Sequence, residues 1–242
     1  MVNQPNILYE DEYLLAIDKP SGVVVNSGFG AENTLQDWID KTQDFPLAHS
    51  FEMRNGIVHR LDKETSGVLL IAKTSEAFYE LQRQFKDRET EKVYVGLVHG
   101  VVEPKERVID APIGRNLKNR MKFGVVEGGR DARTSYTVTQ LLSNTVTGEK
   151  YTLVEFRPHT GRTHQIRVHA KHIGHPIVAD YQYAGRKTTR RDRKWCPRLF
   201  LHAAKLTFRH PAGATLLSQG DKRQTVEAPL PEDLQSVLQS LE

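Results

Sequence analysis

The segment that most constrains this fold is an uninterrupted apolar run at residues 67–72, Gly-Val-Leu-Leu-Ile-Ala. A continuous apolar run of strand length is typical of a β-strand that is buried on both faces. Residues 75–89 then place apolar side chains on one helical stripe, and residues 92–100 alternate in the manner of a strand. A strand, a helix and a strand are therefore expected to connect the region of residue 62 to that of residue 94 within about 35 residues.

The rest of the chain mixes strands and helices without a regular alternation of the two. Residues 7–25 favour two short strands around a Pro20-Ser21-Gly22 turn, and a further helix is expected to begin at Thr160 or Thr163. The tail, residues 231–242, favours a capping amphipathic helix after a core of about residues 7–230. We therefore expect one α+β domain over residues 1–242, with a mixed, largely antiparallel sheet and flanking helices.

Basic residues are concentrated in one part of the chain. Residues 157–209 contain 13 Lys and Arg but only Asp180 and Asp192 as acids, a net charge of +11, whereas the remainder carries −7. This asymmetry is typical of a protein that binds a polyanion, although a solvated basic face would give the same composition. Within this part, residues 183–198 are expected to form a basic loop.

Composition narrows the class of protein further. The single cysteine, Cys196, excludes an intramolecular disulfide framework and a zinc knuckle of the Cys-x-x-Cys type. No run approaches the length of a membrane-spanning helix, and residues 1–15 lack the basic and apolar regions of a signal peptide. We therefore expect a cytoplasmic, monomeric protein with no membrane partner.

The first candidate for chemistry is Asp62, in the polar loop HRLDKETSG at residues 59–67, directly before the buried strand. The edge of a rigid strand holds a side chain in a fixed place, as a site requires. Arg60 and Lys63 flank Asp62 and favour its ionised form. An ionised aspartate can attack a sugar carbon or act as a general base, and it can equally cap a turn.

A second candidate region, residues 159–169, reads HTGRTHQIRVH. Basic residues in the first turns of a helix suit the binding of phosphate or carboxylate. Five histidines between residues 159 and 175 raise the alternative of a metal site, but the segment has no HExxH pattern and no carboxylate before Asp180. We therefore expect no metal.

Tyr94 is the third candidate. On the alternating pattern of residues 92–100 it faces away from Val93 and Val95. Its position suits a half-buried sheet tyrosine whose hydroxyl lies at the rim, and it also suits a platform on which a nucleic-acid base stacks.

Four segments occur in the order and at roughly the spacing of the RluA-type pseudouridine synthases, which the chain resembles: HRLDKETSG, EKVYVGLVHG, HTGRTHQIRVHAKHIGHP and FLHAAKLTFRHP. Two further segments, DKPSGVVV near the start and RDARTSYTV in the middle, are also similar to that family. The likeness extends from about residue 7 to residue 230, and HRLDxxTSG is long and highly specific.

The resemblance implies the pseudouridine-synthase catalytic fold with a central basic cleft, and isomerisation of uridine to pseudouridine in RNA without cofactor or metal. Asp62 matches the catalytic aspartate of the family. Tyr94 matches the tyrosine that stacks on the target base and is proposed to help in proton removal, and Arg167 matches the arginine that pairs with the aspartate. Leu201 is expected to line the base pocket, and Arg60 matches a residue that in one relative fills the gap left by the flipped nucleotide. RNA contacts are expected from six residues: His59, Arg60, Arg133, Arg162, His164 and Gln165.

The RNA substrate is less constrained by these motifs. Many family members carry a small basic RNA-binding domain ahead of the catalytic domain, and because the likeness begins at residue 7 we expect that domain to be absent. Recognition is then expected from the cleft and from loops at residues 115–133 and 183–198. Residues 51–67 resemble the branch that modifies large-subunit ribosomal RNA, which is the expected substrate, with transfer RNA or both RNAs as the alternative.

Functions of other classes are also compatible with parts of the sequence. A non-catalytic RNA-binding or ribosome-assembly factor would share the basic segment, but it would be free to lose Asp62, Tyr94 and Arg167. A metal-dependent hydrolase would use the histidines of residues 159–175. A glycosidase normally needs two catalytic carboxylates, and Glu64 is the one acid near Asp62 in sequence.

Overall fold

The computed structural model describes residues 4–28, 33–116, 122–214 and 223–242. The chain forms two compact units, each made of two segments. Unit 1 contains residues 1–91 and 203–229, and unit 2 contains residues 92–202 and 230–242. The chain passes from one unit to the other inside two strands, β4 (Glu91–His99) and β10 (Leu201–Arg209), and again after Pro229.

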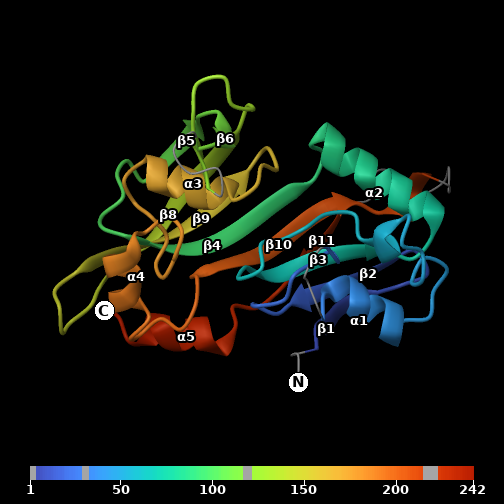
Figure 1. Cartoon of the computed structure of the whole chain (residues 1–242), viewed down its shortest axis with the longest axis horizontal. Coiled ribbons are helices and arrows are strands. Elements are labelled where there is room, and N and C mark those ends of the chain that lie inside the picture. The colour runs from blue at the N-terminus through green and yellow to red at the C-terminus, as the bar shows by residue number, and fades with distance from the viewer. Residues whose placement is uncertain (1–3, 29–32, 117–121, 215–222) are drawn as a thin grey trace. The chain divides into compact units, whose positions relative to one another are not determined.

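Unit 1 is built on the strand order β1-β2-β3-β10, with β11 paired to β10 (Figure 1). The pairs β1–β2, β2–β3 and β10–β11 are antiparallel. The helices α1 and α2 and two 3-10 turns complete the unit, and α2 packs against β3. The remaining elements of unit 1 have these bounds: β1 (Asn6–Glu10), β2 (Leu14–Lys19), α1 (Leu35–Thr42), η1 (Arg54–Gly56), β3 (Ser66–Ala72), α2 (Ser75–Asp87), η2 (Pro211–Ala214), β11 (Arg223–Glu227).

The buried strand predicted from the apolar run is confirmed, because all seven residues of β3 are buried. The expected turn at Pro20-Ser21-Gly22 between the first two strands is wrong. The reversal lies between β1 and β2 at Asp11, whose carboxylate accepts the backbone N–H groups of Tyr13 and Leu14 at 2.8 and 2.9 Å. Such an Asx-type turn needs no proline. The Pro20 segment instead follows β2 and leads toward α1.

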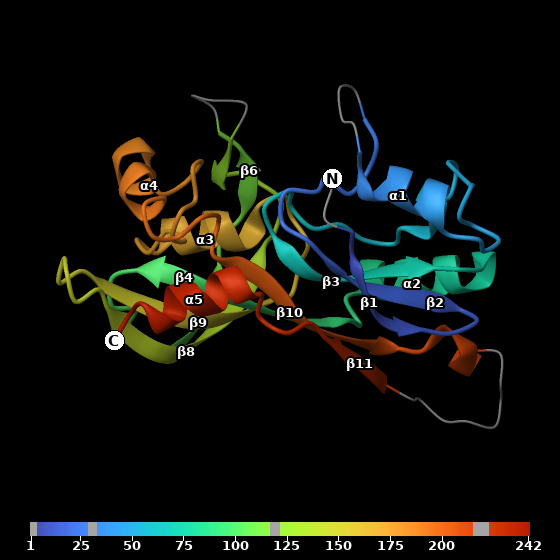
Figure 2. The same cartoon turned by 90° about the horizontal axis from the view of Figure 1, so that it is seen from below.

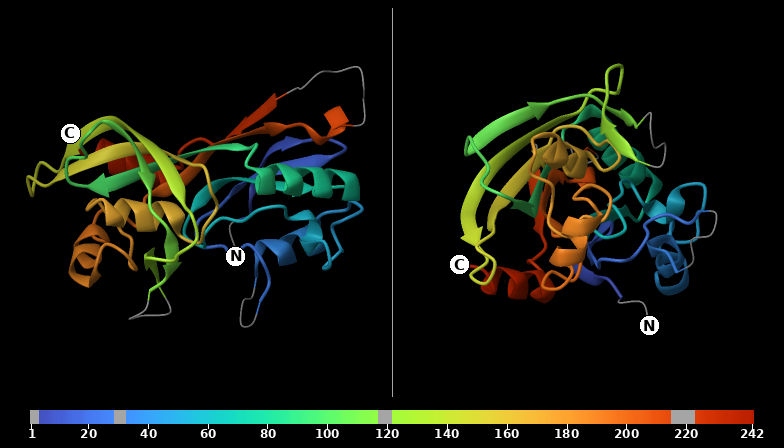
Figure 3. Two further views of the ribbon diagram at one scale, coloured as in Figure 1. Left: turned by 90° about the horizontal axis from the view of Figure 1, so that it is seen from above. Right: turned by 60° about the vertical axis from the view of Figure 1, so that its left-hand side comes forward.

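Unit 2 is built on the strand order β4-β9-β8-β5. The pairs β4–β9, β9–β8 and β8–β5 are all antiparallel. A separate hairpin of β6 and β7 lies beside α3, and the curved sheet wraps around α3 (Figures 2 and 3). The remaining elements of unit 2 have these bounds: β5 (Glu106–Asp110), β6 (Ile113–Arg115), β7 (Phe123–Val125), β8 (Arg133–Ser143), β9 (Lys150–Pro158), α3 (Gln165–His172), α4 (Arg186–Asp192), α5 (Glu232–Gln239).

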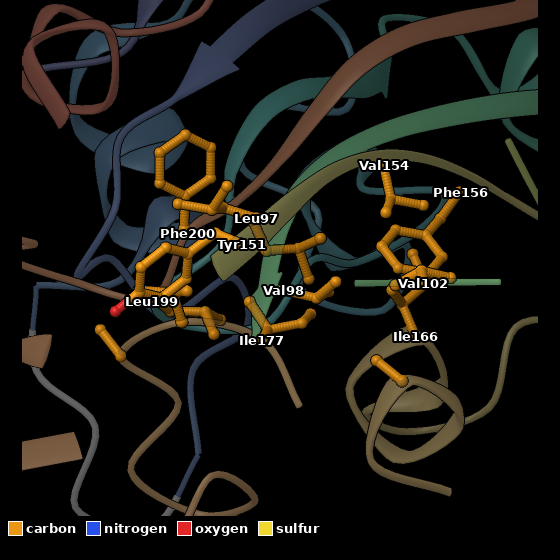
Figure 4. Packing of buried hydrophobic residues seen from close by; sticks show 14 of the residues in the cluster. Leu97, Val98, Val102, Tyr151, Val154, Phe156, Ile166, Ile177, Leu199 and Phe200 are labelled. Carbon is orange, nitrogen blue, oxygen red and sulfur yellow. The ribbon is translucent and has the colours of Figure 1, made fainter. Parts of the chain in front are cut away.

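The core of unit 2 lies between this sheet, α3 and α5. Phe156 and Ile166 lie at one end of the cluster and Tyr151 and Phe200 at the other (Figure 4). The predicted amphipathic helix at the end of the chain is confirmed as α5, which contributes Leu234 and Val237 to this cluster. Burial of such side chains removes apolar surface from water and so holds α5 on the unit.

Two expectations for unit 2 are corrected by the structure. The third helix begins at Gln165 rather than at Thr160 or Thr163, because His164 adopts a left-handed backbone with φ 55°. Residues 183–198 are not a simple loop, since Arg186–Asp192 forms the helix α4. The residues that α4 buries, Thr189 and Asp192, are polar, so no apolar stripe marks this helix in the sequence.

The expected fold class, α+β with a largely antiparallel sheet and flanking helices, is confirmed by these elements. Among the helices of the described ranges, none is long and apolar enough to cross a membrane.

Candidate functional site

Asp62 lies half-buried in the loop that leads into β3. The loop closes as a turn, in which the N–H of Thr65 donates to the carbonyl of Asp62 at 3.1 Å. Thr65 and Ser66, which follow, are buried. The carboxylate therefore stands between a tight turn and a strand that cannot move without opening the core of unit 1, as the sequence predicted.

A buried lysine ties the segment after β2 to this loop. The side chain of Lys19 is fully buried, and its Nζ donates to three carbonyl oxygens, those of Pro20 at 2.8 Å, Val23 at 3.0 Å and Lys63 at 3.2 Å. The N–H of Gly22 also donates to the carbonyl of Lys63, at 2.8 Å. The peptide carbonyl next to Asp62 thus accepts two hydrogen bonds from a distant segment of the chain. Buried polar groups with satisfied partners fix a backbone in one geometry.

A second tie joins the same two segments. Ser21 Oγ donates to the carbonyl of Glu64 at 2.7 Å. Lys19 also faces Gly67 in the β2–β3 pairing. Gly67 has φ +115°, a conformation that L side chains rarely adopt, and a Cβ there would collide with the carbonyl oxygen of Ala203. Both the backbone angle and the lack of space for a Cβ therefore require a glycine at the end of HRLDKETSG.

His59 and Arg60 occupy different environments in this loop. His59 Nε2 accepts the N–H of Leu70 in β3 at 2.9 Å, and its ring stacks on Phe85 of α2, with 4.4 Å between the ring centroids. His59 therefore holds the start of the loop against β3 and α2. Arg60 is exposed, so its guanidinium is available to an anionic ligand.

In unit 2, Tyr94 and Leu201 lie at the core cluster. Tyr94 pairs with Phe156 in the β4–β9 register and is half-buried, packed against the cluster. Leu201 is 3% exposed and belongs to the cluster itself. Gly96, two residues after Tyr94, lies close to both Phe156 and Leu201. A larger residue at Gly96 would press on these side chains.

Arg167 is buried on α3 and forms an ion pair with Asp180, which is fully buried. Its Nε and Nη2 donate to the two carboxylate oxygens at 2.7 and 2.9 Å, and Nη2 also donates to Gln182 Oε1 at 3.0 Å. The guanidinium lies over the ring of Tyr183, 5.1 Å from its centroid. Such a planar, bidentate arrangement fixes the orientation of an arginine far better than a single contact does.

The loop of Asp180 is ordered by the same carboxylate. Asp180 Oδ1 accepts the N–H groups of Gln182 and Tyr183 at 2.9 and 3.1 Å. The hydroxyl of Tyr183 lies 2.9 Å from His164 Nδ1, and the N–H of Phe123 in β7 donates to this hydroxyl at 3.3 Å. His164, predicted as an RNA contact, is therefore half-buried and joined to β7 through Tyr183.

Gln165 is buried, and its amide makes four hydrogen bonds inside the unit. Its Oε1 accepts from Thr160 Oγ1 and the N–H of Arg162, at 2.7 and 3.0 Å. Its Nε2 donates to the carbonyl of Arg133 and to Thr134 Oγ1, at 3.0 and 2.9 Å. Gln165 therefore joins the two segments that carry the predicted RNA contacts Arg133 and Arg162.

Arg133 and Arg162 themselves differ in their surroundings. Arg133 is exposed at the start of β8. Arg162 is half-buried, and its Nε donates to the carbonyl of Asp131 at 2.9 Å. His159, nearby in sequence, lies 2.6 Å from Ser135 Oγ, and burial together with the positive charges of Arg133 and Lys92 lowers its pKa. Cationic side chains therefore gather along this edge of unit 2.

The histidines of residues 159–175 do not converge. His169 is fully buried between Thr134 Oγ1 and the carbonyl of Ala111, at 2.9 and 3.0 Å, and His175 lies 2.8 Å from the carbonyl of His99. In the part of the chain that the structure describes, no three His, Cys, Asp or Glu residues gather as metal ligands would. The arrangement gives no support to the alternative of a metal-dependent hydrolase.

Three of the residues that organise these loops were not singled out in the sequence: Lys19, Asp180 and Tyr183. Lys19 stands in a segment noted for its family resemblance, but its contact with Lys63 spans 44 residues. Asp180 is one of two acids in the basic segment, and that isolation was the available signal.

Comparison with known proteins matches residues 13–172 to the family model described as RNA pseudouridylate synthase. The chain is 40% identical to ribosomal large subunit pseudouridine synthase D of Nitrosomonas europaea, over 97% of this chain and 64% of that protein. It is 38% identical to the protein of the same name in Pseudomonas aeruginosa, over 94% of this chain and 68% of that protein, and 36% identical to an uncharacterised RNA pseudouridine synthase of Bacillus subtilis, over 98% and 72%. This chain thus spans about two thirds of the length of these relatives.

Among solved structures, the chain is similar to human RNA pseudouridylate synthase domain containing 1, with a TM-score of 0.74 and 27% identity over 96% of this chain and 85% of that one. Human RNA pseudouridylate synthase domain containing 4 gives a TM-score of 0.70 and 26% identity over 98% of this chain and 94% of that one. The resemblance inferred from the sequence motifs is confirmed by these matches.

Proposed function

The chain belongs to the RNA pseudouridylate synthase family, and on this premise we propose that it isomerises uridines of large-subunit ribosomal RNA to pseudouridines. The observation that carries the proposal is the family match over residues 13–172, which spans the loop of Asp62, the strand of Tyr94 and the helix of Arg167. The names of the relatives from Nitrosomonas europaea and Pseudomonas aeruginosa support ribosomal RNA as the substrate class.

The reaction breaks the bond between N1 of uracil and C1′ of the ribose and forms a bond between C5 and C1′. The C5 proton is lost and N1 gains a proton, so the product has the same composition as the substrate. The isomerisation involves no net oxidation, because the base that leaves C1′ through N1 is the same group that rejoins it through C5, and it needs no cofactor to balance. A site for it must hold the detached base, let it turn, and exclude water that would capture the sugar.

Asp62 is proposed to act at the ribose. Its carboxylate either attacks C1′ or removes the neighbouring C2′ proton, and both routes need the ionised form. The ties from Lys19 and Ser21 to the carbonyls of Lys63 and Glu64 support this role, because they hold the loop of Asp62 in one geometry. A fixed carboxylate avoids the entropy cost of orienting it during the reaction.

Tyr94 is proposed to stack on the target base and to assist removal of the C5 proton. Arg167 is proposed to support the ionised form of Asp62, with Asp180 orienting its guanidinium. Leu201 is proposed to line the base pocket. The half-burial of Tyr94 beside the apolar cluster supports the stacking role, since an aromatic ring at the edge of a core presents a face to a base.

RNA binding is proposed to come from the arginines Arg60, Arg133 and Arg162 and from His164. A base in a helix is hidden from any carboxylate, so the nucleotide must leave the stack, at a cost of a few kcal/mol. Contacts between arginine and phosphate offset that cost. His59 and Gln165, which bond within the protein, are proposed to hold the loops that carry these arginines. We also propose that the protein acts as a monomer in the cytoplasm.

The test is tritium release from RNA labelled at C5 of uridine. Unmodified transcripts of large-subunit ribosomal RNA and of transfer RNA are incubated with wild-type protein, with Asp62→Asn and with Asp44→Asn, the last a matched control at an exposed carboxylate. We expect release from the ribosomal transcript by the wild type and by Asp44→Asn. Release by Asp62→Asn should be undetectable, while its RNA affinity stays within a few fold of the wild type.

Each arm decides a separate part of the proposal. Tritium release by Asp62→Asn at the wild-type rate would show that Asp62 does not take part in the reaction. Release from the transfer RNA alone would overturn the ribosomal substrate and leave the isomerase intact. Binding of ribosomal RNA with no release from either transcript would favour a non-catalytic RNA-binding factor.

A further inference from the structure

We infer that the exposed face of α4 is a second RNA-binding site that contacts the phosphodiester backbone. This inference rests on the proposed function in that RNA is taken as the substrate. It concerns residues outside the candidate site, on a helix that the family motifs quoted above do not include. Figures 1 and 2 show α4 beside α3, at the end of unit 2 where the β8–β9 turn lies.

The charge of this segment is unusually one-sided. Residues 186–194 read RKTTRRDRK, with six basic residues and one acid, Asp192. Asp192 is 1% exposed and so is not part of the surface that these basic residues form. Arg186, Lys187, Arg190, Arg191 and Lys194 are all exposed.

The helical period separates the charged residues from the anchored ones. At 100° per residue, Arg186, Lys187, Arg190 and Arg191 fall on one side of α4, and the buried Thr189 and Asp192 fall on the opposite side. The basic side chains therefore form one face because the segment is helical.

The opposite side of α4 is held to the rest of unit 2 by hydrogen bonds. Asp192 Oδ2 accepts the N–H of Ala179 at 2.9 Å and lies 3.0 Å from His99 Nε2. Thr189 Oγ1 donates to the carbonyl of Asp180 at 3.1 Å. These bonds fix the direction in which the basic side chains project, and they connect α4 to the loop of the Arg167–Asp180 pair.

The basic charges are largely uncompensated within the protein. Arg191 pairs with Glu149 at 2.8 Å. Across the described residues, no ion pair is formed by Arg186, Lys187, Arg190 or Lys194. Like charges at i and i+4, such as Arg186 with Arg190, disfavour the helix, and a polyanion laid along it relieves that repulsion.

The chemistry of the face favours phosphate over an acidic protein surface. Three of the four basic residues on the face are arginines, whose planar fork binds phosphate oxygens in a bidentate manner. Closely spaced cations with no apolar side chain between them match the repeating charge of a nucleic-acid backbone, which needs no apolar contact. We therefore expect a contribution to affinity that is independent of RNA sequence.

The test measures RNA binding by the full chain as a function of salt. The probe is an unmodified transcript of large-subunit ribosomal RNA, and its affinity is determined between 50 and 200 mM salt. The variant Arg186→Gln/Lys187→Gln/Arg190→Gln is compared with Lys41→Gln/Lys86→Gln/Arg88→Gln, which removes the same charge from exposed residues of unit 1. A third protein, Arg186→Lys/Arg190→Lys, keeps the charge of α4.

We expect the α4 variant to bind at least about tenfold more weakly at the lower salt. Its plot of log affinity against log salt should be shallower by about two to three, since three phosphate contacts are lost and each removes roughly 0.7–0.9 from the slope. The matched control should stay within about twofold of the wild type, and Arg186→Lys/Arg190→Lys should retain the wild-type slope.

Equal losses of RNA affinity in the α4 variant and the matched control would show a general effect of net charge and overturn the inference. No loss of affinity in either variant would also overturn it. The measurement of RNA affinity does not depend on the measurement of tritium release. If the wild type binds RNA but releases no tritium, the proposed isomerase fails while the binding comparison still decides the role of α4. If the wild type binds no RNA, both fail.

Discussion

Arg167 and Asp180 form a bidentate ion pair in which both side chains are buried, with N–O distances of 2.7 and 2.9 Å. The two residues lie 13 positions apart, one on α3 and the other in the loop that precedes α4. Asp180 also accepts the N–H groups of Gln182 and Tyr183. One carboxylate thus orients the arginine proposed for the site and shapes the loop beside it.

We expect Asp180→Ala to lower the free energy of unfolding by about 3–5 kcal/mol, because it removes the buried carboxylate that accepts two hydrogen bonds from the buried guanidinium of Arg167. Urea unfolding followed by circular dichroism checks this. Asp87→Ala is the control, since Asp87 pairs with Arg83 at an exposed position and should cost less than about 1 kcal/mol. In Arg167→Met/Asp180→Ala part of the loss should be recovered. A loss in Asp180→Ala no greater than that of the control would contradict this role.

The pH dependence of stability should carry a contribution from His169. Burial lowers the pKa of this histidine in the folded protein, while in the unfolded chain it returns to about 6.5. The unfolded state therefore takes up the proton first as pH falls. The neutral ring stabilises the fold fully above about pH 6.5, and this contribution declines below that pH, by up to about 1.4 kcal/mol per unit until the folded pKa is reached.

The measurement compares the wild type with His169→Asn in urea unfolding at pH 7.5 and pH 5.0. Asparagine does not titrate, so the difference in unfolding free energy between the two proteins should shrink at pH 5.0. A difference that is constant across this range would show that His169 does not contribute to the pH dependence.

Lys19→Met tests whether the buried lysine positions Asp62. Methionine preserves much of the side-chain volume but removes the donor to the carbonyls of Pro20, Val23 and Lys63. We expect kcat for tritium release to fall by roughly 10²-fold, because small displacements of a reacting group are costly, while KM changes little. Lys41→Met, at an exposed position, is the matched control. Wild-type kcat in folded Lys19→Met would exclude a positioning role.

The periodicity of apolar residues in the sequence predicted the helices and strands that bury apolar side chains. The run that became β3, the stripe of α2 and the terminal helix α5 were all found where the pattern placed them. The helix α4 was not predicted, because the residues that it buries, Thr189 and Asp192, are polar. The start of α3 was misplaced because His164 takes a left-handed conformation, which no rule of helix capping assigns to histidine.

The candidate site was named by its motifs rather than by its contacts. Asp62, Tyr94 and Arg167 were proposed because each stands in a long, specific segment. The partners that fix them could not be predicted, since the bond from Lys19 to the carbonyl of Lys63 joins residues 44 positions apart. For Gln165, its place in a basic motif suggests a ligand contact, whereas the structure shows its amide in four hydrogen bonds inside the protein.

The way in which the two units share the chain bears on the order in which they can be made. Unit 1 is completed by residues 203–229, and unit 2 by residues 230–242. A ribosome that has translated the first 202 residues has therefore produced two incomplete cores, in which Leu234 and Val237 have yet to cover their part of unit 2. Both units then gain their last elements from residues 203–242, so neither core can close before this stretch of the chain has been made.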